Sequence, residues 1–344
     1  MPARCALVPP YILQAVARHA DPEVRDAAIA TLGLDRTFAV NRLLAGPPTR
    51  TAVAAPARLD RLLHDAEGEE LLPGRVVRSE GDAPTGDAAV DEAYDGLGAT
   101  WRLFDERFGR DSIDDAGLRL SGTVHFGHLY DNAYWDGEQM VFGDGDGQVF
   151  ERFTVAVDVI GHELTHGVTG ATADLEYRNQ AGALNESMSD VFGSLVKQYA
   201  LGQTADQADW LIGQGLLAPG VQGVALRSMK APGTAYDDER LGGRDPQPGH
   251  LRDYVRTTGD NGGVHTNSGI PNRAFHLAAV GLGGHAWERA GVVWYDVLTG
   301  GDLPRTATFP QFARLTVASA ERLLDAEAGR TVRAAWAEVG LVLP

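Results

Sequence analysis

The 344-residue sequence contains one cysteine, Cys5, so no disulfide can form within a chain. It also lacks any run of about 18 consecutive apolar residues, which disfavours a transmembrane helix. The first residues show no basic region followed by an apolar core, the pattern of a standard secretory signal. We therefore expect a protein that does not enter membranes and that is cytoplasmic, or secreted by a route without a standard signal peptide.

Basic residues are scarce. The 30 lysines and arginines face 47 aspartates and glutamates, and the formal net charge is -17 at neutral pH. Non-specific binding to nucleic acid depends on basic side chains that contact phosphates, so this class of function is disfavoured. The length suffices for two lobes, each with its own core.

The segment 161–167 (GHELTHG) carries the strongest chemical signal in the sequence. In a helix, His162 and His166 lie one turn apart on the same face, so both can bind one metal ion. Glu163 projects beside this pair, where it can accept a proton from a water molecule that the metal polarises. This pattern is typical of zinc hydrolases.

A chance match on a solvated helix is the alternative interpretation of that segment. The preceding residues 153–160 are apolar, and Leu164 and Val168 continue an apolar stripe at helical spacing. Two histidines and a glutamate in a helix buried on one side cost free energy unless they are paired or bind a metal. The context therefore favours metal ligands.

A catalytic zinc ion needs a third protein ligand, and a second predicted helix offers one. Glu186 is the natural candidate. Asp190 and Asn185 are expected to accept hydrogen bonds from the other ring nitrogens of the two histidines. An acid on the helix surface is the alternative for Asp190, but the apolar run 191–196 that follows disfavours it.

A third group lies in the segment 260–269 (DNGGVHTNSG). Asp260 can orient His265, and a protonated imidazole is a suitable donor to a developing oxyanion. By itself the segment would be interpreted as a turn, because its paired glycines allow the backbone to bend sharply. Beside the zinc motif we interpret it as catalytic.

These segments, in this order, resemble the thermolysin family of zinc metalloendopeptidases, and the resemblance covers about residues 58 to 340. It includes the segments 132–135 (NAYW) and 139–147 (QMVFGDGDG). The resemblance implies a neutral endopeptidase with zinc held by His162, His166 and Glu186, and with Glu163 as general base. A non-catalytic zinc protein that binds peptides would need none of Glu163, Tyr177 and His265. A secreted toxin or structural factor that acts by adhesion is a second alternative, which we disfavour because no appended repeat is evident.

The resemblance also assigns residues to the substrate. It implies that Asn132 and the carbonyl of Ala133 bind peptide backbone, that Arg227 holds the substrate carbonyl beyond the scissile bond, and that Tyr177 assists the oxyanion. The pocket for the residue after the scissile bond is expected to be apolar, so cleavage should precede Leu, Phe or similar residues. Its expected lining is Phe150, Phe153, Val159 and Leu226.

The first residues resemble the short propeptide of protealysin-like members of this family, through 8–13 (VPPYIL) and 32–34 (LGL). This implies a zymogen arm in which Pro9, Pro10, Tyr11 and Leu13 pack against the catalytic domain. Proteolysis near residues 45 to 52 would then release activity. Cys5 could ligate zinc in the latent form, and a free thiol is the alternative.

The expected architecture is α+β with two lobes and the zinc cleft between them. We expect a helical propeptide and linker at 1–50, a mixed α/β lobe with the zinc helix at 51–174, and an all-α lobe at 175–344. The segment 143–147 lacks the lysine of a phosphate loop and the twelfth-position glutamate of an EF-hand, so a tight turn is expected. Helices are expected at 21–32, 83–108, 152–173, 183–201, 268–283, 286–299, 309–325 and 328–339, and strands at 118–126 and 139–142.

The family commonly binds calcium, and Asp158 matches one ligand of its double calcium site. Lys197 stands where a glutamate ligand is expected, and an ammonium group there would repel the ion. We therefore expect this double site to be absent or reduced. The expected partners are protein or peptide substrates and a proteinaceous inhibitor, and the expected state is a monomer.

Overall fold

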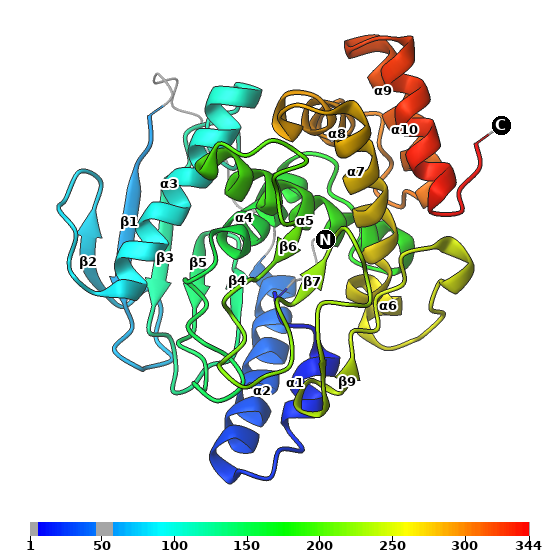
Figure 1. Ribbon diagram of the computed structural model, residues 1–344. Helices are drawn as coiled ribbons and strands as arrows, with labels where there is room; N and C mark the ends of the chain where they lie inside the picture. Colours follow the sequence, from blue (N-terminus) through cyan, green and yellow to red (C-terminus); the bar gives the residue numbers. More distant parts are fainter. Residues whose placement is uncertain (1–5, 46–57, 344) are drawn as a thin grey trace.

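The computed structural model describes residues 6–45 and 58–343 (Figure 1). In the N-terminal segment, α1 (Pro10–Val16) begins with a proline, whose fixed φ suits the first turn of a helix. The next helix, α2 (Pro22–Ala45), includes the helix expected at 21–32 and continues past it. Gly33 lies inside α2, where a single glycine is tolerated. The described part of the expected propeptide, residues 6–45, which we call the prosegment, is therefore helical, as expected.

A five-stranded sheet follows, in the order β2-β1-β3-β5-β4. The central strands β1, β3 and β5 are parallel, and the outer strands β2 and β4 are antiparallel to their neighbours. The residue pattern did not indicate three of these strands, because β1 has polar ends around only two leucines, β2 is an edge strand with little burial and β4 has only three residues. The bounds are β1 (Arg61–Asp65), β2 (Arg75–Ser79), β3 (Leu120–Val124), β4 (Ala133–Trp135) and β5 (Gln139–Phe142).

Three long helices pack together beside this sheet, and two of them supply the metal-site residues. The first, α3 (Ala88–Phe108), starts at Asp87, whose carboxylate caps two backbone amides, and ends at Gly109 in the left-handed conformation. It packs against both the sheet and α4 (Val157–Ala171), and α4 packs closely against α5 (Asn179–Leu201). Gly161 and Gly193 face each other at this crossing, and a Cβ on either would meet the backbone of the other helix. Both glycines thus let α4 and α5 approach closely enough to share one site.

The remainder of the chain is mostly helical, after a long loop region with two small two-stranded sheets. Its helices match the expected segments to within a few residues, so the fold is α+β followed by a helical part. In the described ranges, no helix is long and apolar enough to cross a membrane. The elements are β6 (Leu211–Ile212), β7 (Arg227–Ser228), β8 (Asp237–Asp238), η1 (Glu239–Leu241), β9 (Gly243–Arg244), η2 (Leu251–Asp253), α6 (Asp260–Asn267), α7 (Gly269–Leu282), η3 (Ala286–Glu288), α8 (Ala290–Thr299), α9 (Phe309–Leu323) and α10 (Ala326–Glu338).

Candidate metal and active site

The crossing of α4 and α5 brings the expected metal ligands together. The Nε2 atoms of His162 and His166, one helical turn apart, are separated by 3.1 Å. Glu186 reaches across from α5, and its carboxylate oxygens lie 3.7 Å from His162 Nε2 and 3.8 Å from His166 Nε2. These three side chains present one ligand atom each within 4.8 Å of one another.

The hydrogen bonds around the two histidines test whether this group fits zinc. His162 Nδ1 lies 2.8 Å from Asp190 Oδ1, and His166 Nδ1 lies 2.8 Å from Asn185 Oδ1. These acceptors keep the protons on the Nδ1 atoms, so both Nε2 lone pairs point into the shared space. Two lone pairs at this distance repel each other unless a cation lies between them. Tetrahedral zinc with bonds of about 2.0 to 2.1 Å would separate its nitrogen ligands by about 3.4 Å, so the group fits zinc.

Asp190 links the metal group to the substrate side of the site. Its carboxylate accepts hydrogen bonds from Arg227 Nη2 at 2.8 Å and from Asn272 Nδ2 at 2.8 Å, besides the contact with His162. Burial opposes the charged form, but the Arg227 guanidinium and His162 outweigh it and hold the pKa of Asp190 well below its usual value. Arg227 is thus fixed by the same carboxylate that orients a histidine.

Glu163 is fully buried beside the metal group. Its Oε2 accepts a hydrogen bond from Trp135 N at 3.1 Å, and its Oε1 lies 3.9 Å from His162 Nε2. Burial raises the pKa of Glu163 well above its usual value, and the nearby charge of Glu186 adds to this effect. The hydrogen bond from β4 holds one oxygen, so the other is directed toward the histidines.

Tyr177 and His265 also lie next to Glu186. The Tyr177 hydroxyl donates to Glu186 Oε1 and lies 3.1 Å from His265 Nε2. Asp260 Oδ1 lies 2.6 Å from His265 Nδ1. Burial lowers the pKa of His265, but the carboxylates of Glu186 and Asp260 outweigh it and raise this pKa to about 9. The imidazole is therefore protonated at neutral pH.

The backbone of α6 explains how Asp260 reaches His265 from five positions earlier in the chain. Residues 260–263 all have positive φ, between 49° and 89°, so the first turn is not helical. Two of the four are glycines, which adopt this conformation without strain. The resulting bend lets both oxygens of Asp260 bind His265, because Oδ2 also accepts from the backbone nitrogen of His265 at 2.9 Å.

The prosegment lies across the expected peptide-binding residues. Leu7 N donates to the carbonyl of Ala133 at 3.1 Å, and the Leu7 carbonyl accepts from Arg227 Nη1 at 3.3 Å. Val8 N donates to Asn132 Oδ1 at 2.9 Å, and the Val8 carbonyl lies 3.5 Å from Asn132 Nδ2. The three groups expected to hold a substrate backbone thus all bind two consecutive residues of the chain's own N-terminal segment.

The expected packing of the prosegment is only partly observed. Pro9 and Leu13 are buried and Tyr11 is half-buried, but Pro10 is exposed. The prediction that Pro10 packs against the catalytic part was wrong, because this residue instead begins α1 with its ring toward solvent. Cys5 lies outside the described residues, as does most of the processing region expected near 45–52.

Two family models match the chain. They are the thermolysin metallopeptidase catalytic domain, over residues 61–170, and the thermolysin metallopeptidase alpha-helical domain, over residues 173–341. The chain belongs to the thermolysin family. It is a zinc metalloendopeptidase, and a non-catalytic peptide-binding protein is not favoured.

Individual relatives place the chain among the protealysin-like members of the thermolysin family. It is 53% identical to the extracellular metalloprotease of Pectobacterium carotovorum subsp. carotovorum, over 98% of this chain and 96% of that protein. It is 50% identical to protease PrtS of Photorhabdus sp. (strain Az29), over 97% of this chain and 91% of that one. The solved precursor of protealysin from Serratia proteamaculans superposes with a TM-score of 0.90, at 54% identity, and covers 98% of this chain and 100% of that one.

The apolar residues that the thermolysin resemblance assigns to the specificity pocket are all buried in the core cluster that also contains Leu7. The rings of Phe150 and Phe153 have centroids 5.8 Å apart, and Phe150 forms an isolated β-bridge with Leu217. The residues assigned to this pocket are Phe150, Phe153, Val159 and Leu226.

Sequence reasoning missed several residues of this thermolysin-type site. Ser189 Oγ lies 3.1 Å from His166 Nδ1, and Asn272 binds Asp190. Asp35 on α2 accepts hydrogen bonds from Asn132 Nδ2 at 3.0 Å and from the Tyr130 hydroxyl at 2.5 Å. Ser189 could have been found, since it lies three positions after Glu186. The partners of Asn272 and Asp35 are distant in sequence, so no local pattern identifies them.

Proposed function

We propose that the protein is a latent neutral endopeptidase that hydrolyses peptide bonds on the N-terminal side of hydrophobic residues. The observation that carries this proposal is the position of Leu7 and Val8 against Ala133, Asn132 and Arg227. An extended segment at the edge of a sheet gains affinity from main-chain hydrogen bonds and selectivity from side-chain pockets. The prosegment occupies this edge in the manner of a substrate.

The metal group and Glu163 together account for the attack on the peptide bond. Zinc, held by His162, His166 and Glu186, would supply the Lewis acid that polarises the reacting water and carbonyl. Glu163 accepts the proton of the attacking water and passes it to the leaving amine. Its burial and its 3.9 Å distance from His162 Nε2 support this role.

The oxyanion of the tetrahedral intermediate needs donors that are already in place before the reaction. We assign this role to the His265 imidazolium and the Tyr177 hydroxyl, with Asp260 as the residue that positions His265. Asp190 and Asn185 hold the histidine tautomers that bind metal. The hydrogen bonds described above support each assignment.

The Leu7 side chain supports the preference for hydrophobic residues. In our assignment, Arg227 holds the carbonyl of the residue after the scissile bond, and in this structure that carbonyl belongs to Leu7. Its side chain is completely buried and belongs to the extended main core, which also includes Phe150 and Val159. Burying a leucine side chain stabilises a complex by roughly 1.5 to 3 kcal/mol, whereas a charged side chain there would lose its hydration.

Two separate contacts support latency. Leu7 and Val8 fill the backbone-binding groups, and Asp35 on α2 holds the Asn132 side chain from the other direction. Asn132 Nδ2 lies closer to Asp35 Oδ2, at 3.0 Å, than to the Val8 carbonyl, at 3.5 Å. We propose that Asp35 forms a second latch. Its hydrogen bond prevents the Asn132 side chain from binding a substrate, even when Leu7 and Val8 move away.

We also propose that a lysine replaces calcium in this chain. Lys197 Nζ lies 3.2 Å from Asp158 Oδ2 and 2.7 Å from Asp209 Oδ2. Burial disfavours the charged ammonium, but Asp158 and Asp209 outweigh it and raise the pKa of Lys197. The ammonium thus neutralises the carboxylates that would otherwise attract calcium. Elemental analysis should find fewer than two tightly held calcium ions per chain, because the double site is absent or reduced, and two such ions would contradict the proposal.

Several broader assignments rest on the relatives. We propose action outside the cell, because the Pectobacterium relative is named an extracellular metalloprotease. A fractionated culture with a cytosolic marker checks this.

We propose a propeptide and linker at 1–50 and catalytic lobes at 51–174 and 175–344, which the matched ranges 61–170 and 173–341 support. A monomeric state and a proteinaceous inhibitor remain predictions.

A digest of a peptide mixture by the processed enzyme tests the proposed specificity. Mass spectrometry of the products should show cuts that mainly precede Leu, Phe and similar residues. The Glu163→Gln variant, processed by an added protease, serves as the control and should yield none of these products. Cuts that mainly precede charged residues would refute the proposed pocket, even if the enzyme is active.

A further inference from the structure

The prosegment continues from the cleft into α1, and α1 covers a surface that the proposed chemistry does not use. The apolar face of α1, formed by Ile12, Leu13 and Val16, is completely buried or nearly so. This helix packs against α2 and also against η1, whose Leu241 is buried. Removal of the prosegment would therefore uncover η1, the catalytic-part element that carries Leu241.

Two further contacts define this surface. A Cβ on Gly242, which follows η1, would meet the Cβ of Ala15 at 3.3 Å, so α1 approaches the backbone closely there. The Tyr11 side chain lies beside that of Tyr236, and the two phenols interact electrostatically. We call the surface formed by Tyr236, Leu241 and Gly242 the α1 seat.

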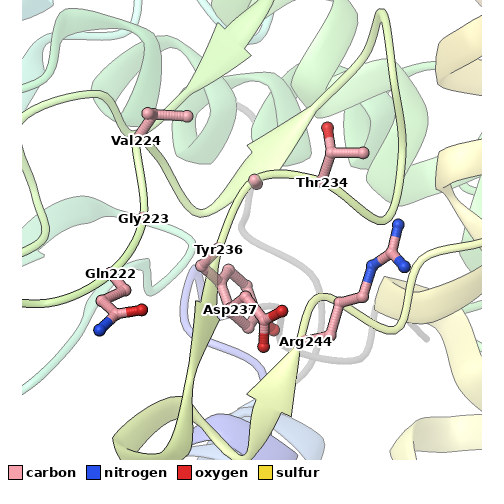
Figure 2. Close-up of a pocket in the computed structure, with 8 residues that line it drawn as sticks. Gln222, Gly223, Val224, Thr234, Tyr236, Asp237 and Arg244 are labelled. Carbon is pink, nitrogen blue, oxygen red and sulfur yellow. The ribbon is translucent and has the colours of Figure 1, made fainter.

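A pocket of about 470 Å³ adjoins the α1 seat, and Tyr236 belongs to both. Figure 2 shows Tyr236 and Asp237 at the centre of the pocket, with Arg244 on one side and Val224 on the other. Val224 is 57% exposed, although it is a large apolar residue. The pocket thus offers both an apolar wall and charged groups to a chain that extends past the seat.

The order of the prosegment residues gives the direction in which a substrate would leave the cleft. If Leu7 takes the place of the residue after the scissile bond, then Pro10, the first residue of α1, corresponds to the fourth residue on that side. The C-terminal part of a protein substrate would leave along the same path. It would therefore meet the α1 seat once the prosegment is gone.

We propose that the α1 seat and the adjoining pocket form an exosite, which binds the substrate from about the fourth residue after the scissile bond and favours an apolar helical segment. This inference rests on the proposed function. Its occupant is argued from continuity with the cleft, because α1 itself is such a segment and is seated there. Apolar side chains that processing exposes beside the cleft are typical of a binding site.

Synthetic peptides test the exosite on the processed enzyme. The reference peptide has the sequence of residues 6–17 (ALVPPYILQAVA) between a fluorophore and a quencher. The second peptide ends after the position of Pro10, and the third carries Ile12→Glu. The matched control carries Gln14→Glu, which adds the same charge on the exposed face of the helix.

The exosite predicts that truncation and Ile12→Glu each raise KM by about tenfold, whereas Gln14→Glu leaves it near the reference value. If the reference peptide binds without being cut, inhibition constants give the same comparison. Equal KM values for the reference and truncated peptides, or equal effects of the two glutamates, would overturn the exosite.

A variant of the enzyme, in place of a changed peptide, also tests the exosite. Leu241→Ala should reduce the advantage of the reference peptide over the truncated one, and a melting curve reports whether the variant is folded. Val342→Ala, at a residue 82% exposed in the C-terminal segment, is the control. If the processed enzyme makes no cuts before leucine in the digest of a peptide mixture, the proposed function itself fails. If all the synthetic peptides are cut before the leucine equally well, only the exosite fails.

Discussion

Replacement of Asp35 by alanine should weaken latency and leave the metal ligands and Glu163 in place, although the charge of Asp35 contributes to the raised pKa of Glu163. Asp35 accepts one hydrogen bond from Asn132 Nδ2 and one from the Tyr130 hydroxyl. A hydrogen bond to a charged group contributes about 1.5 to 3 kcal/mol, and the half-buried position of Asp35 reduces this through contact with water. We estimate a loss of about 2 kcal/mol for both bonds together, which raises the fraction of open precursor about 30-fold.

The assay is the activity of the intact chain on a quenched peptide, recorded before any processing is visible on a gel. Asp26→Ala is the matched control, because it removes an acid from the same helix at a side chain that is 70% exposed. Asp35→Ala should show about 30-fold higher initial activity than the wild type, up to the limit set by the processed enzyme. Equal activity of the two alanine variants and the wild type would refute the latch.

Further substitutions test the general base, the protonated imidazole and the buried lysine ammonium. Glu163→Gln should keep bound zinc, measured by elemental analysis, and lose turnover, because only the general base is removed. The pKa of His265, about 9, is raised above its usual value, so the imidazolium is present below that pH and is lost above it. Asp260→Asn should therefore move the alkaline fall of kcat/KM to lower pH by roughly one unit. Lys197→Met should lower the melting temperature, because it leaves the buried Asp158 carboxylate unpaired.

The metal ligands could be predicted because their signal is local. The spacing of His162 and His166 specifies a shared helix face, and Glu186 lies in a second helix whose apolar pattern is strong. By contrast, the close crossing of α4 and α5 depends on Gly161 and Gly193, which have no periodic signal. The resemblance to a known family, rather than spacing, identified Arg227.

Contacts between distant segments could not be predicted. Asp190 binds His162 as expected, but its simultaneous bonds to Arg227 and Asn272 depend on the packing of helices far apart in the chain. Asp35 belongs to a helix with little amphipathic pattern, so no local signal marks its carboxylate. The short strand β1 was missed for a similar reason, because it pairs with β3 across about 60 residues and has few apolar positions of its own.

The most direct test of the account compares the intact chain with the processed enzyme on one quenched peptide that carries leucine after the scissile bond, with and without a zinc chelator. The account predicts that the intact chain is nearly inactive, that removal of the prosegment releases activity, and that the chelator abolishes this activity until zinc is restored. An intact chain as active as the processed enzyme would contradict it, because Leu7 and Val8 could not then occupy the cleft.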